Sequence, residues 1–370
     1  MTAFSKKITG SEVLFYFKRA VLIIISWMLL SNIIFFYDYT ILKSVNGFDS
    51  NFDFEVSYKT FLIVSFIASI IGGVFAVNMM EFWLRKYAFW KAVILIIVLY
   101  TVMAFLVGTL GAIYYFTDYL GLAIDSEALK AKISAFYLEG IFIKGYFTWL
   151  LIILITLVTL MINDKYGPGV FVDYLMGRYF LPKKETRIFM FADIRDATRI
   201  AESIGEKEYF NFLKDFFNDI TPAIMQTKGE VYQYVGDEVV ITWKMKNGLK
   251  KSNALHCYYK MKDIIKSKET IYTKRYGEVP GFKVGFHYGQ VMVGELGKIK
   301  RDIAFSGDVL NTTARIQSIC NQRGVDILAS KAFSDILTKL PKGVHRIEQE
   351  SASLKGKAEK VAVVSFERVE

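Results

Sequence analysis

The sequence has little of three residue types that often carry chemistry or constrain a fold. Its 370 residues include two cysteines, three histidines and five prolines. Two cysteines form no disulfide framework and suit a reducing compartment. Scattered prolines and the lack of low-complexity tracts exclude a collagen-like or disordered chain. Because every histidine lies beyond residue 250, the N-terminal half offers no axial ligand for a haem.

Charged residues are also scarce. They make up 22% of the chain, whereas hydrophobic residues make up 53% and aromatic residues 16%. A soluble protein carries about 25% charged residues, so part of this chain is expected in lipid. Four apolar stretches are long enough to cross a hydrocarbon core of ~30 Å. They cover residues 19–37, 58–80, 90–116 and 143–162.

The cores of these four stretches contain no Asp, Glu or Arg that would mark an ion or proton path. Lysines such as Lys91 and Lys144 lie only at the borders. A transporter, a pump and a retinal protein are therefore not expected. Two interpretations of this region stay open. It is either a bundle that anchors and dimerises the protein, or a sensor of a membrane-soluble or extracellular ligand.

Lysine and arginine flank the four stretches unevenly. Four precede the first stretch and three lie between the second and third: Lys6, Lys7, Lys18, Arg19, Arg85, Lys86 and Lys91. The positive-inside rule places these ends in the cytoplasm. We therefore expect a multi-pass protein of the inner (plasma) membrane with both termini in the cytoplasm.

Three parts are predicted along the chain: a four-helix transmembrane domain over 1–162, a linker over 163–184, and a soluble domain over 185–370. Gly167-Pro168-Gly169 should end the fourth helix. The linker is either a packed connector or a transducer of a membrane rearrangement. The part after residue 162 carries 34 Lys and Arg against 26 Asp and Glu. This excess suits nucleic acid, phosphorylated molecules or an anionic membrane, and charge alone does not choose among them.

The soluble part alternates strand and helix patterns. An apolar run ends at Asp193, and residues 201–226 have apolar positions at helical spacing. Strand-like runs meet at Gly236-Asp237 and again at Gly289, which predicts two hairpins; the runs are 230–235 with 238–243, and 282–288 with 290–296. A further helix is predicted over 307–320, followed by a strand, a helix and a single final strand.

Two aspartates end neighbouring strands of this predicted domain. Asp193 closes the first strand, and Asp237 lies at the tip of the next hairpin. Carboxylates placed together repel unless a divalent cation lies between them, and Mg²⁺ is usually held by one or two carboxylates plus substrate phosphates. The peptide from Ile194 to Thr198 leads into a helix whose free N–H groups can hold phosphate. A two-metal site for phosphoryl or nucleotidyl transfer is the resulting hypothesis.

Five segments resemble, in order and spacing, the catalytic domain of class III nucleotidyl cyclases. They are FADIRDAT (191–198), YQYVGDEVV (232–240), GFHYGQVMVGELG (285–297), SGDVLNTTAR (306–315) and LKGKAEK (354–360). The resemblance covers about residues 185–370. It implies an α+β domain with a ferredoxin-like βαββαβ core behind an α-helical membrane bundle. It further implies an adenylate cyclase that converts ATP to 3′,5′-cyclic AMP and pyrophosphate.

The resemblance also implies metal ligands. Asp193 and Asp237 match the two metal-binding aspartates, with the Ile194 carbonyl as an additional ligand, for two Mg²⁺ or Mn²⁺ ions per site. Thr198, at the start of the following helix, is a candidate for binding the nucleotide phosphates.

Other matched positions imply substrate contacts. Asn311 and Arg315, four residues apart on one helix face, match the pair that orients the ribose and stabilises charge on the phosphate in the transition state. Lys357 matches the lysine that grips the terminal phosphates. In this family the acids and the Asn/Arg pair meet across a head-to-tail homodimer interface, so a homodimer is expected.

Two positions depart from the family pattern. Adenylate cyclases typically have Lys three residues before the hairpin glycine and Asp or Thr three before the glycine of the Asn helix, and guanylate cyclases have Glu and Cys. This chain has Gln233 and Ala304 there. A glutamine amide suits either purine, whereas alanine offers no polar contact, unless a neighbour such as Ser306 supplies it. We expect ATP as substrate; a guanylate or mixed-specificity cyclase is the alternative.

Three other interpretations compete with an adenylate cyclase. A diguanylate cyclase would share the hairpin from Val235 to Val239, but its signature has a glycine and a phenylalanine at these two positions. It would also not explain Asn311, Arg315 and Lys357. A catalytically silent, cyclase-like membrane receptor would need none of this chemistry. No nucleic-acid partner is expected, since the basic clusters are explained by solvated surface or by anionic lipid.

Overall fold

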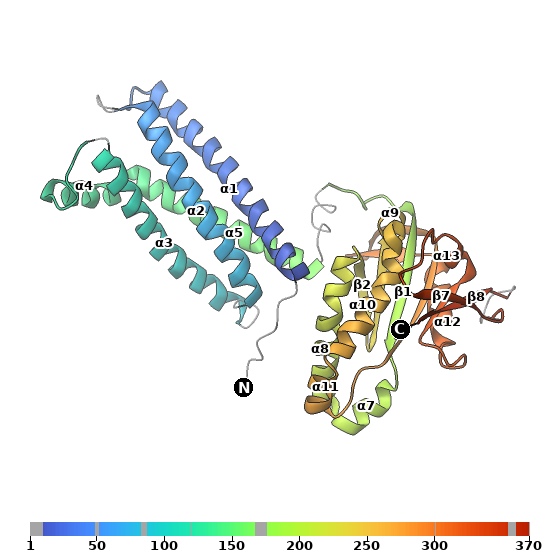
Figure 1. Cartoon of the computed structure of the whole chain (residues 1–370). Helices are drawn as coiled ribbons and strands as arrows, with labels where there is room; N and C mark the ends of the chain where they lie inside the picture. The colour runs from blue at the N-terminus through green and yellow to red at the C-terminus, as the bar shows by residue number, and fades with distance from the viewer. Residues whose placement is uncertain are drawn as a thin grey trace. The chain divides into compact units, whose positions relative to one another are not determined.

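The computed structural model describes residues 10–48, 52–82, 87–118, 120–166, 176–299, 301–353 and 360–369. Figure 1 shows the whole chain. It divides into two compact units, Met1–Tyr166 and Gly167–Glu370. The first unit is helical and the second mixes helices with a sheet, and each contains a hydrophobic core of its own. This confirms the predicted fold class.

Four long apolar helices form most of the first unit: α1 (Gly10–Ser44), α2 (Phe54–Phe82), α3 (Phe89–Asp118) and α5 (Gly140–Tyr166). Each contains a stretch long and apolar enough to cross a membrane, namely Val13–Ser44, Phe54–Met79, Trp90–Asp118 and Phe142–Asp164. These stretches overlap the four predicted ones. A multi-pass membrane protein is the architecture that they support.

A shorter helix, α4 (Glu127–Leu138), lies between the third and fourth membrane stretches and was not predicted. Ser126 caps its N-terminus by accepting a hydrogen bond from the Leu129 N–H at 3.2 Å. The Tyr137 ring packs on Phe105 of α3 with a centroid distance of 4.9 Å, and its hydroxyl donates to the Phe105 carbonyl. Its mixture of charged and apolar residues gave no strong period in the sequence.

Small and polar residues join the long helices. A Cβ at Gly72 of α2 would lie 2.6 Å from the Trp27 ring of α1, so only glycine permits this approach. The Trp27 indole N–H donates to the Thr156 hydroxyl of α5 at 3.1 Å. Arg19 of α1 forms an ion pair with Asp164 of α5 at 2.6 Å. The first helix is therefore tied to both the second and the last.

The second unit is built on an eight-stranded sheet with the order β2-β3-β1-β4-β6-β8-β7, and β5 pairs with β4. All pairs are antiparallel except β4 with β6. The strands are β1 (Lys183–Ile194), β2 (Glu230–Val235), β3 (Glu238–Lys244), β4 (Phe282–Leu296), β5 (Asp302–Ser306), β6 (Ile327–Ser330), β7 (Val344–Glu348) and β8 (Val363–Arg368).

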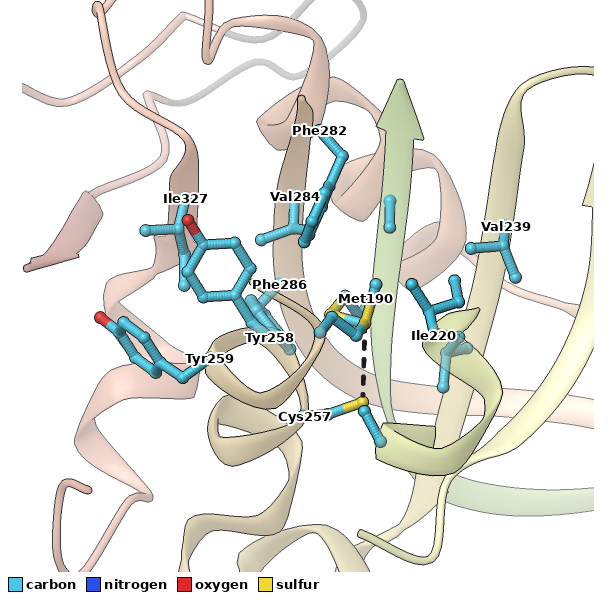
Figure 2. Packing of buried hydrophobic residues seen from close by; sticks show 14 of the residues in the cluster. Met190, Ile220, Val239, Cys257, Tyr258, Tyr259, Phe282, Val284, Phe286 and Ile327 are labelled. Carbon is cyan, nitrogen blue, oxygen red and sulfur yellow. Dashed lines mark hydrogen bonds between the residues drawn. The ribbon is translucent and has the colours of Figure 1, made fainter. Parts of the chain in front are cut away.

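Helices pack on this sheet and build a core on each face. Side chains of β1 alternate, so that Met190 faces a larger core with α8 and α10, whereas Phe189 faces a smaller core with α12. Figure 2 shows part of the larger core, including Met190, Phe286 of β4 and Cys257 of α10. The helices are α7 (Ala197–Ile204), α8 (Glu206–Gln226), α9 (Met245–Leu249), α10 (Asn253–Ser267), α11 (Glu269–Tyr276), α12 (Asp308–Ser318) and α13 (Lys331–Asp335).

The end of the predicted linker belongs to the smaller core. Tyr179 is only 9% exposed and packs there, and its carbonyl accepts a hydrogen bond from the Glu295 N–H at 3.0 Å. Residues 167–175, which include the predicted helix end at Gly167-Pro168-Gly169, lie outside the described residues. The last part of the linker is thus packed against β4.

Three predicted elements differ from the structure. The expected helix over 201–226 is broken at Gly205, whose φ of +81° places it in the left-handed region. The expected hairpin at Gly289 is wrong, because β4 runs straight through this residue and turns only after Leu296. A Cβ at Gly289 would lie 3.3 Å from Val309 of α12, so this glycine serves close packing. Two final strands, β7 and β8, replace the single predicted one.

Candidate active site

Three carboxyl groups gather where β1 meets the β2–β3 hairpin. Asp193 lies directly opposite Glu238 in the β1–β3 register, and Asp237 precedes Glu238 in the turn. Gly236, with a φ of +61°, makes this turn possible. The Asp193 and Asp237 carboxyls are within hydrogen-bond reach of each other. The structure thus brings together the two aspartates that the sequence placed at strand ends.

Burial and neighbouring negative charge raise the pKa values of Asp237 and Glu238. Burial, a hydrogen bond to Asp193 and the charge of Asp193 raise the pKa of Asp237 to about 6. Burial and the same two aspartates raise the pKa of Glu238 to about 7. The hydroxyl of Tyr209 on α8 is also affected, since burial and the two aspartates raise its pKa to about 12. Such a cluster favours an added positive charge.

Two neighbouring side chains contact Asp193. The Lys283 ammonium lies 3.1 Å from Asp193 Oδ2, and Lys283 is the register partner of Asp193 on β4. The Gln317 amide of α12 donates to the same oxygen at 2.9 Å. Sequence reasoning missed these two residues as well as Glu238 and Tyr209. The strand register would have placed Lys283 and Glu238 beside Asp193. The contact of Gln317 could be inferred only once the position of α12 on the sheet was known.

The acids fit a divalent cation. Two carboxylates close enough to share a proton would both be ionised beside Mg²⁺ or Mn²⁺, and the buried Ile194 follows Asp193 in β1. Within the part of the chain that the structure describes, no group of three or more His, Cys, Asp and Glu side chains could hold a metal ion. Two carboxylates that leave positions for phosphate oxygens are the usual protein share of a Mg²⁺ site.

The predicted phosphate-binding helix start is formed by α7. Asp196 precedes it with a φ of +54°, and its side chain makes no capping hydrogen bond. The first N–H groups of α7 therefore keep their capacity to bind an anion. Thr198 is exposed in this first turn.

Asn311 and Arg315 are not brought to the acids of the same chain. Both lie on α12, Asn311 exposed and Arg315 half-buried, and neither side chain forms a hydrogen bond or ion pair with another described residue. Gln317, which does reach Asp193, is two residues after Arg315 and so points about 200° away from it around the helix. Asn311 and Arg315 therefore face away from the acidic cluster.

The two predicted base-reading positions lie next to a contact between β2 and β5. The Tyr232 ring packs on Phe305 with a centroid distance of 4.9 Å. A bulge at Tyr232 shifts the register so that Gln233 pairs with Val240. Gln233 is exposed and Ala304 is half-buried. The predicted phosphate-gripping Lys357 lies outside the described residues.

Residues 182–366 match the family model described as the adenylate and guanylate cyclase catalytic domain. The chain belongs to this family.

Known relatives agree with this assignment. The chain is 31% identical to adenylate cyclase 2 of Rhizobium meliloti (strain 1021) over 209 residues, which cover 56% of this chain and 57% of the relative. It is 28% identical to an adenylate cyclase of Anabaena cylindrica over 180 residues, 47% of this chain and 35% of the relative. The chain thus spans about half the length, or less, of these relatives.

A solved structure shares the fold. A bacterial light-regulated adenylyl cyclase superposes with a TM-score of 0.50 at 19% identity, covering 59% of this chain and 63% of the other. The second unit is therefore a cyclase catalytic domain in its fold as well as in its sequence.

The cyclase domain also contains an open pocket of about 390 Å³. Residues of α10, β7 and β8 line it together with residues 325–327, and none of the predicted site residues that the structure describes does. The acids, the Asn/Arg pair and the predicted base-reading positions consequently do not line this pocket.

The raised pKa of Asp237 predicts a pH dependence of the cyclase domain's stability without divalent cations. The folded state holds this proton up to about pH 6, whereas the unfolded carboxyl loses it near 3.8. Stability from this group is therefore lost as pH rises from about 4 to 6. In EDTA at pH 7.5, Asp237→Asn should unfold at a temperature about 2–4 °C higher than the unchanged protein, after discounting the shift for solvent screening.

Thermal unfolding of the full chain in detergent at pH 5 and pH 7.5 measures this difference. Glu202→Gln, at an exposed position on α7, is the matched control and should leave the temperature unchanged at both values. An Asp237→Asn protein that is less stable than the unchanged chain at pH 7.5 would contradict the electrostatic account.

Proposed function

We propose that the chain is a membrane-anchored adenylate cyclase that converts ATP to 3′,5′-cyclic AMP and pyrophosphate at sites shared by two copies of the chain. The observation that carries the proposal is the division of the site residues. Asp193 and Asp237 meet at one end of the sheet, while Asn311 and Arg315 face away from them on α12. Both sets are needed for the reaction, and a second copy would supply the missing set to each.

The proposed reaction is an internal displacement on the nucleotide. The 3′-hydroxyl loses its proton to solvent as its oxygen forms a bond to the α-phosphorus, the bond from this phosphorus to the bridging oxygen breaks, and pyrophosphate leaves. Asp193, Asp237 and the Ile194 carbonyl would hold Mg²⁺ or Mn²⁺. Two bound ions would supply positive charge that lowers the pKa of the 3′-hydroxyl and neutralises the phosphates.

The remaining residues would bind and orient the nucleotide. The Asn311 amide is assigned to the ribose, and the Arg315 guanidinium is assigned to the oxygens of the α-phosphate, where charge develops. The N–H groups at the start of α7, beside Thr198, and the Lys357 ammonium would bind the other phosphates. Bound cations would favour the ionised form of Asp237, whose pKa is raised by burial and by Asp193.

The edge of the sheet supports a second copy as the partner. β2 is an edge strand, and three of its apolar side chains, Val231, Tyr234 and Val235, are 38%, 50% and 52% exposed. Exposed apolar residues on an edge strand are an association surface. They flank Gln233 and lead into the turn of Asp237, so a partner on this edge would adjoin the site. A two-fold dimer would contain two equivalent sites.

In the membrane, we propose that the four helices of the first unit place both termini in the cytoplasm of the inner membrane. There the cyclase domain meets its nucleotide. A membrane-soluble or extracellular ligand of this bundle would be the regulatory signal, passed through the linker over 163–184.

Product formation from ATP and from GTP, each with Mg²⁺ or Mn²⁺, tests the proposed substrate. Cyclic AMP as the main product is the expected result. Ala304 offers the base no hydrogen bond, and this observation favours mixed specificity as the second candidate function. No cyclic product from either nucleotide would instead support a silent receptor.

Restoring the family's adenine-reading pair should sharpen selectivity. The Gln233→Lys, Ala304→Asp double variant is expected to raise the ratio of kcat/KM for ATP over GTP by about tenfold or more, because polar groups that hydrogen-bond adenine would be left unpaired against guanine. Ser306→Ala in the unchanged background shows whether this neighbour already reads the base. A double variant with an unchanged ratio would show that these two positions do not contact the base.

A further inference from the structure

Gln317 occupies a position that joins two functional parts of the cyclase domain. It is 4% exposed, and its amide donates to Asp193 Oδ2 at 2.9 Å. It belongs to α12, whose outer face carries Asn311 and Arg315. Only one residue separates Arg315 from Gln317 in the chain. The Gln317 side chain therefore links Asp193, an acid of one site, to the helix that carries Arg315, the arginine of the other site.

The helix that carries Gln317 is firmly seated. A Cβ at Gly285 of β4 would lie 2.5 Å from the Gln317 backbone nitrogen and 2.7 Å from the Thr313 carbonyl oxygen. The backbones of β4 and α12 are thus in direct contact, with no side chain between them. β4 also carries Lys283, the other partner of Asp193 Oδ2. If Asp193 were displaced, α12 would therefore move with it as a rigid element, because the close packing leaves no space to absorb the displacement.

We propose that Gln317 is a positioning residue that couples the two active sites of the dimer, by linking the metal-binding acid of one site to the helix that supplies Asn311 and Arg315 to the other. This inference rests on the proposed shared site. Filling one site would change the hydrogen bond between Asp193 and Gln317 and so the position of α12, which serves the opposite site. The coupling free energy between the two sites would be carried by this contact.

A heterodimer with a single working site separates coupling from a purely local role. It is made by co-expressing an Asp237→Ala chain and an Arg315→Ala chain with different tags and purifying on both. In its working site the Arg315→Ala chain gives the acids and the Asp237→Ala chain gives the arginine. Gln317→Met, which keeps the volume of the side chain, is then placed in one chain or the other.

The two placements have different expected results. In the acid-giving chain, Gln317→Met should raise the Mn²⁺ concentration for half-maximal activity about tenfold, as loss of a hydrogen bond to a metal ligand commonly does. In the arginine-giving chain, whose own acids serve only the dead site, it should lower kcat about fivefold with the Mn²⁺ midpoint unchanged. Mn²⁺-dependent thermal stabilisation of the Gln317→Met homodimer should show the same tenfold weaker midpoint without turnover.

Thr313→Val is the matched control, because Thr313 is buried on the same face of α12 but its hydroxyl bonds the Val309 carbonyl of its own helix. The proposed coupling is overturned if Gln317→Met in the arginine-giving chain changes kcat no more than Thr313→Val does in that chain. This holds even if Gln317→Met in the acid-giving chain raises the Mn²⁺ midpoint. An inactive heterodimer before Gln317 is changed would overturn the shared site itself, and the two failures are thereby distinguished.

Discussion

Replacing Asp237 by alanine is expected to lower cyclic nucleotide formation by the full chain about 1,000-fold or more. The carboxylate would share a metal position with Asp193, and removing one of the two charges proposed to hold a cation would also remove the charge that the cation brings to the phosphates. The measurement is the initial rate of product formation with saturating ATP and Mn²⁺. Raising Mn²⁺ further should recover little of the loss, because the remaining carboxylate is already paired with Lys283.

Two comparisons make this result specific. Asp237→Asn keeps the size of the side chain and should be as inactive as Asp237→Ala, while its higher unfolding temperature in EDTA would show that the fold is intact. Glu202→Gln, on the exposed face of α7, should keep the full rate. Near-normal turnover by Asp237→Ala would remove the metal assignment and, with it, the proposed reaction.

Mixing two inactive variants should restore activity. Asp193→Ala and Arg315→Ala homodimers each lack one component in both sites. A heterodimer of the two has one site with both defects and one site with none. With random pairing, half of the dimers are mixed and each has one of two sites, so about a quarter of the unchanged activity is expected. Co-expression followed by an activity assay on purified protein measures it.

The control for this experiment combines Asp193→Ala with Asp237→Ala. Both changes affect the acid side, so every pairing leaves both sites damaged and no activity should return. If the Asp193→Ala and Arg315→Ala mixture also stays inactive, the site is not shared between chains. Recovery in the control mixture would show that one of the two aspartates is dispensable.

The two predicted hairpins show where local sequence was sufficient. Gly236 forms a turn because, with Asp237, it joins the last residue of β2 to the first residue of β3, and its φ is positive. Gly289 has the same surroundings in sequence, yet it lies in the middle of β4, where Val309 of α12 occupies the space of a side chain. A glycine needed for its conformation and a glycine needed for its size look alike until the packing partner is known.

The candidate site divides in the same way. Asp193 and Asp237 were predictable because each follows a strand pattern, and the β1–β3 register then brings them together. Lys283 and Gln317 come from β4 and α12, and only the tertiary structure shows that both reach the same carboxylate oxygen. The position of Asn311 and Arg315 on one helix face was predicted, but the direction of that face depended on where α12 docks.

The ties between the first and last membrane helices have a consequence for biosynthesis. Trp27 enters the membrane with α1, but its partner Thr156 belongs to α5, as does Asp164, the partner of Arg19 at the helix end. Until the ribosome has delivered α5, the indole N–H lacks this partner in a medium that offers few others. The bundle is therefore expected to close only after the last helix has inserted, just before the cyclase domain emerges. Chains that stop short of α5 should be recognised by membrane quality control as unassembled.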